Sequence, residues 1–229
     1  MSVLDLLAGV DWRPIGLTLR VAVAATGLSV VIGSLLGYAL STFHFPGRRW
    51  AMAAVMLPLV LPPTVLGYYL LVLIGRRGPI GELWMAVFGG PLVFTTNAAI
   101  IAASVSAIPI VARQLAAAFA STDSEVLEAA RIDGAGAARL FLSVYLPLMR
   151  PALGAATTIA FARCVGDFGA TLMVAGSIPG ETQTASIAIY ELMNAGRDGE
   201  AFVLVLIVSM ISLAVLAFAG GPEFKRPPR

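Results

Sequence analysis

The chain has 229 residues, of which 59% are hydrophobic and only 12% are charged, and its formal net charge is +2. A charged fraction about half that of ordinary domains excludes a soluble globular protein. The few basic residues are dispersed along the chain, which excludes a nucleic-acid partner.

Five apolar runs are long enough to cross a bilayer, which needs about 20 mostly apolar residues. They cover residues 21–43, 50–75, 83–112, 151–180 and 201–222. We therefore predict an all-α, polytopic membrane protein: a bundle of five transmembrane helices in one domain, residues 1–229. Residues 187–194 are too few to cross and are predicted to form a short helix outside the membrane or dipping into it. We expect the first span, not a cleaved signal peptide, to direct insertion.

The distribution of Lys and Arg predicts the orientation of the chain. These residues are more numerous around the segments on the side of residues 121–150 than on the opposite side. Basic residues favour the cytoplasmic face of a membrane. The sequence therefore predicts a multi-pass protein of the bacterial inner membrane, with its N-terminus outside and its C-terminus in the cytoplasm.

The first two spans carry residues that shape helices. Gly33 and Gly37 form a small-residue face that permits another helix to approach closely, and packing within one chain is the favoured interpretation. In the second span Pro58, Pro62 and Pro63 lack the backbone N–H and clash with the preceding turn, so this helix must bend or break. A bend suits a pathway that opens and closes, and a purely structural kink is the alternative.

Polar residues in the third and fourth spans are candidates for a transport route. The hydroxyls of Thr95, Thr96, Ser104 and Ser106 either line a polar path or, as is more frequent, bond back to their own helix. Arg163 and Asp167 are four residues apart, so they share a helix face and can pair. The pair either has a transport role or only neutralises itself while locking neighbouring helices. The candidate pathway or gate residues are Pro62, Pro63, Thr157, Thr158, Arg163 and Asp167.

Residues 121–150 form a charged segment that must lie outside the hydrocarbon. Thr122 and Glu125 fit a capping box, which predicts a helix starting near Asp123. Asp133-Gly134 predicts a break, followed by a second helix from about 135 to 145 that Leu146-Pro147 ends. Two short helices joined by a glycine turn make a projection that a soluble partner can grip. The charged residues of the segment are Asp123, Glu125, Glu128, Arg131, Asp133, Arg139 and Arg150.

The chain lacks the residues that an energy-converting or catalytic protein needs. A nucleotide-binding loop requires a lysine, and the single lysine, Lys225, is near the C-terminus. His44 is expected in a loop and Cys164 in a span, so neither a catalytic triad, a metal cluster nor a disulfide is predicted. We therefore expect no enzyme activity and no cofactor, and energy must come from a partner. An intramembrane enzyme is disfavoured, and so is a secondary transporter with inverted repeats, because five spans do not divide into two matching halves.

The charged segment resembles the EAA loop of ABC-transporter permeases. The resemblance implies that it is a coupling helix, which sits in a groove of a cytoplasmic ATPase dimer that binds the ATP. The matching positions that the resemblance makes coupling residues are Glu128, Ala129, Ala130, Gly134, Leu146 and Pro147.

A larger part of the chain is similar to the molybdate ABC-transporter permeases. The motifs that carry this resemblance are LPLVLPPTVLGYYLL, GRRGPIGE, FARCVGDFGAT and IPGETQT. It implies a type I importer fold, two copies of the permease, two ATPases and a periplasmic oxyanion-binding protein that delivers molybdate or tungstate. That family usually has Glu where this chain has Asp167. Sulfate permeases share the motif around Arg163 and Asp167, so a sulfate or thiosulfate permease is the alternative.

Overall fold

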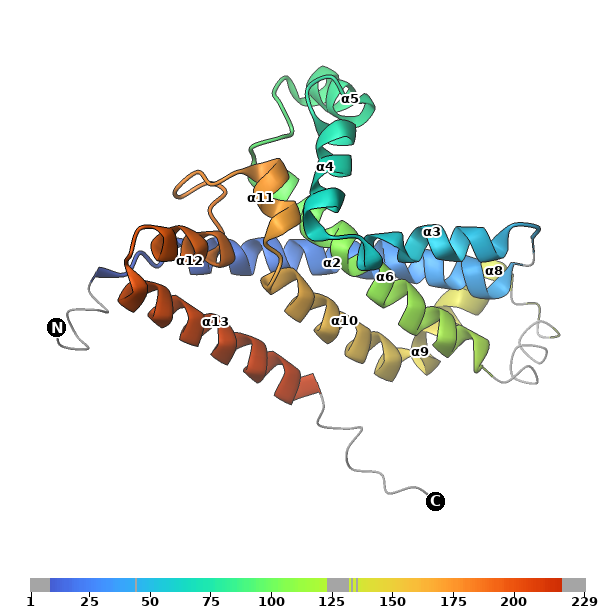
Figure 1. Cartoon of the computed structure of the whole chain (residues 1–229). Helices are drawn as coiled ribbons and strands as arrows, with labels where there is room; N and C mark the ends of the chain where they lie inside the picture. Colours follow the sequence, from blue (N-terminus) through green and yellow to red (C-terminus); the bar gives the residue numbers. More distant parts are fainter. Residues whose placement is uncertain (1–8, 44, 123–131, 133, 135, 220–229) are drawn as a thin grey trace.

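The computed structural model describes residues 9–43, 45–122, 132, 134 and 136–219, and it is helical throughout, with no strand among them (Figure 1). The helices are α2 (Arg13–Thr42), α3 (Arg48–Val60), α4 (Pro63–Ile74), α5 (Pro79–Phe88), α6 (Thr96–Ala120), α8 (Ala137–Leu140), the π-helix η1 (Phe141–Tyr145), α9 (Leu146–Leu148), α10 (Arg150–Val165), α11 (Gly169–Ala175), α12 (Ala185–Asn194) and α13 (Asp198–Ala219). The predicted all-α class is confirmed.

The centre of the bundle is the pair α2 and α6, with α10 packed against both. A Cβ added to Gly33 would lie 2.7 Å from the Cβ of Val111, and one added to Gly37 would lie 2.9 Å from the carbonyl oxygen of Ala112. Ser29 Oγ also donates to the carbonyl of Ser104 across this contact, at 3.1 Å. The small-residue face therefore serves packing within the chain, as its spacing predicts.

Within the described residues, three helices are long and apolar enough to cross a membrane by themselves, and the number of candidate spans is five if each of two bent helix pairs counts as one. The second span consists of α3 and α4, which are bent by 113° relative to each other. Pro62 lies at this break and Pro63 opens α4, so the predicted bend is confirmed. The fourth span consists of α10 and α11, bent by 61°.

The start of the third span is a correction to the sequence analysis. The predicted run from residue 83 is divided between α5 and α6, because Gly89 takes a left-handed conformation with φ 73° and ends α5. Thr95 then caps α6, its Oγ1 accepting from the amide of Ala98 at 3.3 Å. With ten residues, α5 is too short to cross a membrane. It lies beside α4, in the arm that projects from the bundle in Figure 1.

The end of the bundle that carries the start of α2 also carries α12 (Figure 1). This helix matches the predicted short helix, and it packs on α2 and α13. The amide of Ala185 donates to Thr18 Oγ1 at 2.7 Å, which fixes the start of α12 to α2. At this end α13 turns back along the bundle, and half of its described large apolar side chains are exposed. We call this end the α12 end.

Candidate functional site

The breaks of the two bent spans lie against each other. A Cβ added to Gly169, the first residue of α11, would lie 2.8 Å from the Cβ of Pro63, the first residue of α4. One turn further along α4, a Cβ on Gly67 would lie 2.7 Å from the Cβ of Met173. These separations are shorter than ordinary van der Waals contact, so only glycine fits at either position. The two breaks therefore form one tightly packed joint.

Asp167 lies in the break between α10 and α11, and its carboxylate is surrounded by donors. Arg163 Nη1 and Ser106 Oγ donate to Oδ1, at 3.0 and 3.1 Å. The amide and the hydroxyl of Thr171 donate to Oδ2, at 3.2 and 2.6 Å. The Asp167 side chain is only 2% exposed. A buried carboxylate is tolerated when it is paired and fully hydrogen-bonded, and this one meets both conditions.

The spacing of Arg163 and Asp167 predicts their ion pair, and the structure contains it, but not on a continuous helix. The last residue of α10 is Val165, and Gly166, with φ −88° and ψ 5°, stays close enough to helical geometry to keep the four-residue relationship. The Arg163 side chain remains 32% exposed. A charge facing lipid near the middle of a membrane costs on the order of 3 kcal/mol on insertion scales. A guanidinium at this depth that is not covered by its own chain therefore has to face water or another protein surface.

The other candidate pathway residues lie in two places. Pro62 and Pro63 are at the joint, beside the start of α11. Thr157 and Thr158 instead line an apolar groove of about 520 Å³ between α2, α10 and α13. Their hydroxyls donate to carbonyls of their own helix, those of Leu153 and Gly154. The structure thus groups the prolines with the charged pair and separates the threonines from it.

The hydroxyls of Ser106 and Thr171 both donate to Asp167, and the sequence analysis predicted neither contact. Ser104 bonds back to its own helix, through the carbonyl of Ile100 at 2.6 Å, whereas Ser106 reaches Asp167. Ser104 therefore makes the predicted bond to its own helix, whereas the buried Ser106 bonds a carboxylate of another span, which neither alternative predicts. Thr171 was missed, although it follows Asp167 by four residues and that spacing is a signal for contact on a helix.

The segment with the EAA resemblance is only partly visible. Glu128, Ala129 and Ala130, and the predicted helix start near Asp123, lie outside the described residues, as does His44. Gly134 has φ 79°, the left-handed conformation expected of a glycine turn. Gly134 is exposed, and a Cβ added to it would meet no other atom within 4 Å.

The predicted helix end at Leu146-Pro147 is wrong. The chain continues as α9 and then as α10 after Met149. Pro147 is tolerated because it lies in the first turn of α9, where a missing N–H is not needed. The preceding turn is a π-helix in which the amide of Leu146 donates to the carbonyl of Phe141. Leu146 and Pro147 therefore belong to a connected helical return into the bundle.

An aromatic cluster anchors this return to the core. The ring of Tyr38, near the end of α2, lies 5.4 Å from Phe119 of α6, 5.1 Å from Phe141 and 5.6 Å from Tyr145 of the π-helix. The rings meet edge-on, the arrangement that aromatic pairs prefer. The rings therefore join the chain at residues 141–145 to α2 and α6.

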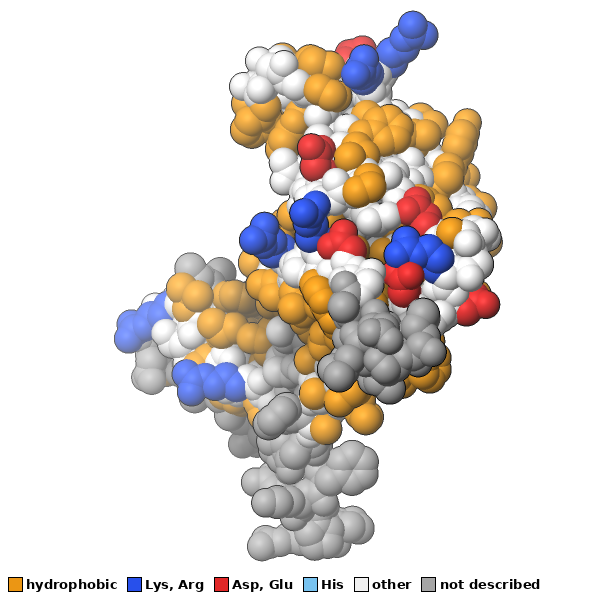
Figure 2. All heavy atoms as spheres, turned by 90° about the vertical axis from the view of Figure 1, so that its left-hand side faces the viewer, with side chains coloured by type: hydrophobic (Ala, Val, Ile, Leu, Met, Phe, Trp, Pro, Cys, Tyr) orange, Lys and Arg blue, Asp and Glu red, His pale blue; other side chains and the backbone are white. Residues whose placement is uncertain are grey.

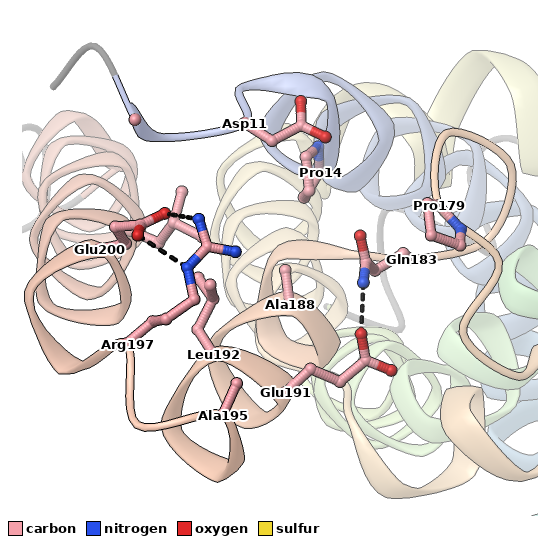
Figure 3. A pocket seen from close by; sticks show the side chains of 12 residues that line it. Asp11, Pro14, Pro179, Gln183, Ala188, Glu191, Leu192, Ala195, Arg197 and Glu200 are labelled. Carbon is pink, nitrogen blue, oxygen red and sulfur yellow. Dashed lines mark hydrogen bonds and ion pairs between the residues drawn. The ribbon is translucent and has the colours of Figure 1, made fainter. Parts of the chain in front are cut away.

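A pocket of about 360 Å³ opens at the α12 end (Figure 3). Its charged lining residues are Asp11, Glu191, Arg197 and Glu200. Arg197 Nε donates to Glu200 Oε1 at 2.7 Å, and Gln183 donates to Glu191 at 2.5 Å. Charged side chains gather on this face of the molecule, as Figure 2 shows. Carboxylates outnumber the guanidinium in the pocket, so its field disfavours an anion.

Comparison with known proteins identifies the class. Residues 29–220 match the family described as binding-protein-dependent transport system inner membrane component. The chain belongs to this family, and it is therefore a multi-pass inner-membrane permease subunit of an ABC importer. Subunits of this class are transport components, and ATP hydrolysis belongs to a separate subunit.

Several individual members of this family are similar to the chain over most of its length. The chain is 38% identical to the putative molybdenum transport system permease protein YvgM of Bacillus subtilis, over 90% of this chain and 91% of that one. It is 37% identical to the molybdenum transport system permease protein ModB of Escherichia coli K12, over 92% and 93%. A probable sulfate transport system permease protein, cysT of Nephroselmis olivacea, is 33% identical over 87% and 70%. The resemblance to molybdate permeases is thereby confirmed.

Solved structures agree with the fold. A bacterial ABC transporter involved in the import of the acidic polysaccharide alginate superposes with a TM-score of 0.71 at 16% identity, covering 91% of this chain and 77% of that one. The MetNI methionine ABC transporter, in an inward-facing conformation, gives 0.67 at 23% identity, covering 96% and 98%. The predicted importer-permease fold is confirmed.

Proposed function

We propose that this protein carries molybdate or tungstate across the inner membrane, as the permease of an ATP-driven importer. The observation that carries the proposal is the identity of 38% and 37% to two molybdenum permeases over about nine-tenths of each chain. The absence of a nucleotide-binding loop from the sequence agrees with an energy source on another chain.

The proposed mechanism is alternating access by two copies of the permease. Residues 121–150 face the cytoplasm and dock on an ATPase dimer, which places the N-terminus outside and the C-terminus inside. Closure of the ATPases on ATP pulls on Glu128, Ala129, Ala130 and the turn at Gly134. The aromatic cluster around Tyr38 supports transmission of that movement, because it joins the returning chain to α2 and α6. A periplasmic oxyanion-binding protein delivers the substrate at the opposite end.

Reconstitution tests this mechanism directly. The permease, its ATPase and its binding protein are placed in proteoliposomes, and uptake of labelled molybdate is measured together with ATP hydrolysis. Gly134→Ala strains a left-handed residue, so we expect hydrolysis to continue while uptake falls. Gly136→Ala is the matched control, since Gly136 is equally exposed and is not among the positive-φ glycines. Glu128→Ala is expected to uncouple in the same way. Unchanged uptake and ATPase association in both Glu128→Ala and Gly134→Ala would refute the coupling assignment.

Sulfate import is the second candidate, favoured by the 33% identity to a probable sulfate permease. The same vesicles separate the two when molybdate, tungstate and sulfate compete at equal concentrations. We expect molybdate and tungstate to displace each other and sulfate to compete poorly. Uptake that needs no ATP would instead indicate a secondary transporter.

A further inference from the structure

We propose that the guanidinium of Arg163 is the point inside the membrane at which the transported oxyanion contacts the protein, and that Asp167 positions this guanidinium without contacting the anion. The inference rests on the proposed import of a tetrahedral oxyanion and deepens it by naming a substrate contact.

Arg163 has donors to spare. A guanidinium carries five N–H groups in a planar fork that matches the oxygens of an oxyanion. Within the described part of the chain, the recorded hydrogen bond from this side chain is the one from Nη1 to Asp167. The remaining N–H groups are free to replace water around an anion.

The face of α10 that carries Arg163 consists mainly of small residues, as expected of a helix that lines a transport pathway. Counting from Arg150, thirteen residues at about 1.5 Å each place Arg163 roughly 20 Å along the helix, deep in the fourth span. Between residues 150 and 166 the sole large apolar side chain that is exposed is Ile159, at 41%. On α13, by contrast, Phe202, Met210 and Leu213 are each more than 60% exposed. Lipid favours the second kind of surface, whereas a face of small residues around an arginine suits an aqueous space or a second protein surface. The other exposed or half-exposed residues on the Arg163 side of α10 are Ala152, Ala155, Ala162 and Gly166.

Asp167 is buried and Arg163 is partly exposed, so an anion can approach the positive member of the pair and not the negative one. The side chain of Asp167 is 2% exposed and that of Arg163 is 32% exposed. Both carboxylate oxygens are occupied by donors from Ser106, Thr171 and Arg163 itself. The positively charged side chain is therefore the accessible member of the pair, and the negatively charged one is enclosed in the bundle.

Arg163 and Asp167 together have no net charge, and this suits transient binding of an anion during transport. Passage requires binding strong enough for the anion to come in and weak enough for it to leave. A guanidinium already neutralised by a buried carboxylate gives a weaker hold than a free one. The acidic pocket at the α12 end is no competitor for this role, because Asp11, Glu191 and Glu200 repel an anion.

The experiment separates anion contact from simple neutralisation of Asp167. The complete transporter is reconstituted with Arg163→Gln, Asp167→Asn, the double variant, and Arg113→Gln as a control. Arg113 is an exposed arginine of a spanning helix, and the described structure gives it no ion pair. The readouts are assembly with the ATPase, basal ATP hydrolysis, and the initial rate of molybdate uptake as a function of concentration.

We expect Arg163→Gln alone to impair assembly, because it leaves a buried carboxylate without its cation. The double variant should regain assembly and basal hydrolysis while its uptake stays roughly tenfold or more below the parent. Uptake in the double variant that matches the parent would overturn the proposal, since Arg163 would then serve only to neutralise Asp167.

Arg163→Lys supplies a second readout that does not depend on the double variant folding. Lysine keeps the charge but loses the planar fork. We expect a higher KM for molybdate, with kcat changed less, and a shifted preference between molybdate and sulfate. An unchanged KM and preference would also overturn the proposal. A parent transporter that moves no oxyanion would refute the proposed function itself, which is a different outcome from either result.

Discussion

Ser106 on α6 donates a hydrogen bond to Asp167 in the break between α10 and α11, with 3.1 Å between Oγ and Oδ1. This bond joins the centre of the bundle to the only described part of the fourth span that is not helical. The irregular backbone at membrane depth is therefore tied to a packed, well-ordered helix, which is the condition under which such backbone is tolerated.

Ser106→Ala removes this bond while leaving Arg163 and Thr171 on the carboxylate. We expect the free energy of unfolding in mild detergent to fall by about 1 kcal/mol, because a buried charged acceptor loses one of its donors. Thermal unfolding followed by circular dichroism measures the change. Ser34→Ala is the control, since the bond that the described structure gives the Ser34 hydroxyl is to the carbonyl of Val30 on its own helix. Equal effects of the two substitutions would contradict the structural role of Ser106.

Gly37→Ala should separate α2 from α6. The new methyl group would lie 2.9 Å from the carbonyl oxygen of Ala112, which is backbone and cannot rotate away. We expect a loss of about 1–3 kcal/mol in stability from overpacking. Gly27→Ala in the same helix meets nothing within 4 Å and should be neutral or slightly stabilising, because alanine is the better helix former. A neutral result at Gly37 would show that this helix contact is looser than described.

Tyr38→Ala should weaken both stability and coupling. The substitution removes the ring that contacts Phe119, Phe141 and Tyr145, and loss of a packed aromatic side chain costs about 3 kcal/mol or more. We expect fewer molybdate ions transported per ATP hydrolysed in proteoliposomes. Tyr68→Ala is the control, because the recorded ring contact of Tyr68 is with its exposed neighbour Tyr69. A lower stability with unchanged coupling would leave the cluster a purely structural role.

Thiol labelling reports which face of α10 meets water. Cys164 is 3% exposed and its Sγ lies 3.6 Å from the carbonyl of Ala103, so we expect no reaction with a charged methanethiosulfonate reagent. In a Cys164→Ala background, Ala162→Cys and Gly166→Cys should react, and Phe202→Cys on the apolar face of α13 should not. Mass spectrometry of the labelled protein measures all four positions. Labelling at residue 202 but not at 162 or 166 would place the aqueous space elsewhere.

Much of the fold follows from the sequence, because the relevant signals are local. Long apolar runs predict the five spans, Pro62 and Pro63 predict the bend of the second span, and Gly33 with Gly37 predicts a close helix contact. The ion pair of Arg163 and Asp167 follows from their four-residue spacing.

The errors occur where contacts distant in sequence or a weak local signal decide the backbone. The break at residues 166–168 is stabilised in part by Ser106, which is 61 residues from Asp167 in the sequence. The contact of Gly169 with Pro63 and that of Gly67 with Met173 likewise join separate spans. Leu146-Pro147 looks like a helix end because a proline usually breaks a helix, but the π-turn before it accommodates the ring. At the third span, the long apolar run led to the prediction of one continuous helix, although Gly89 and Thr95 are local signals for a helix end and a helix start.

The order of Ser106 and Asp167 along the chain bears on how the protein is made. Synthesis runs from the N-terminus, so α6 is complete when Asp167 emerges from the ribosome. Ser106 on α6 then precedes the acidic residue that it stabilises. Arg163, only four residues earlier, emerges just before the carboxylate. When the Asp167 carboxylate enters the bilayer, Arg163 is therefore already present to neutralise it, and the Ser106 hydroxyl is already in place to donate a hydrogen bond to it.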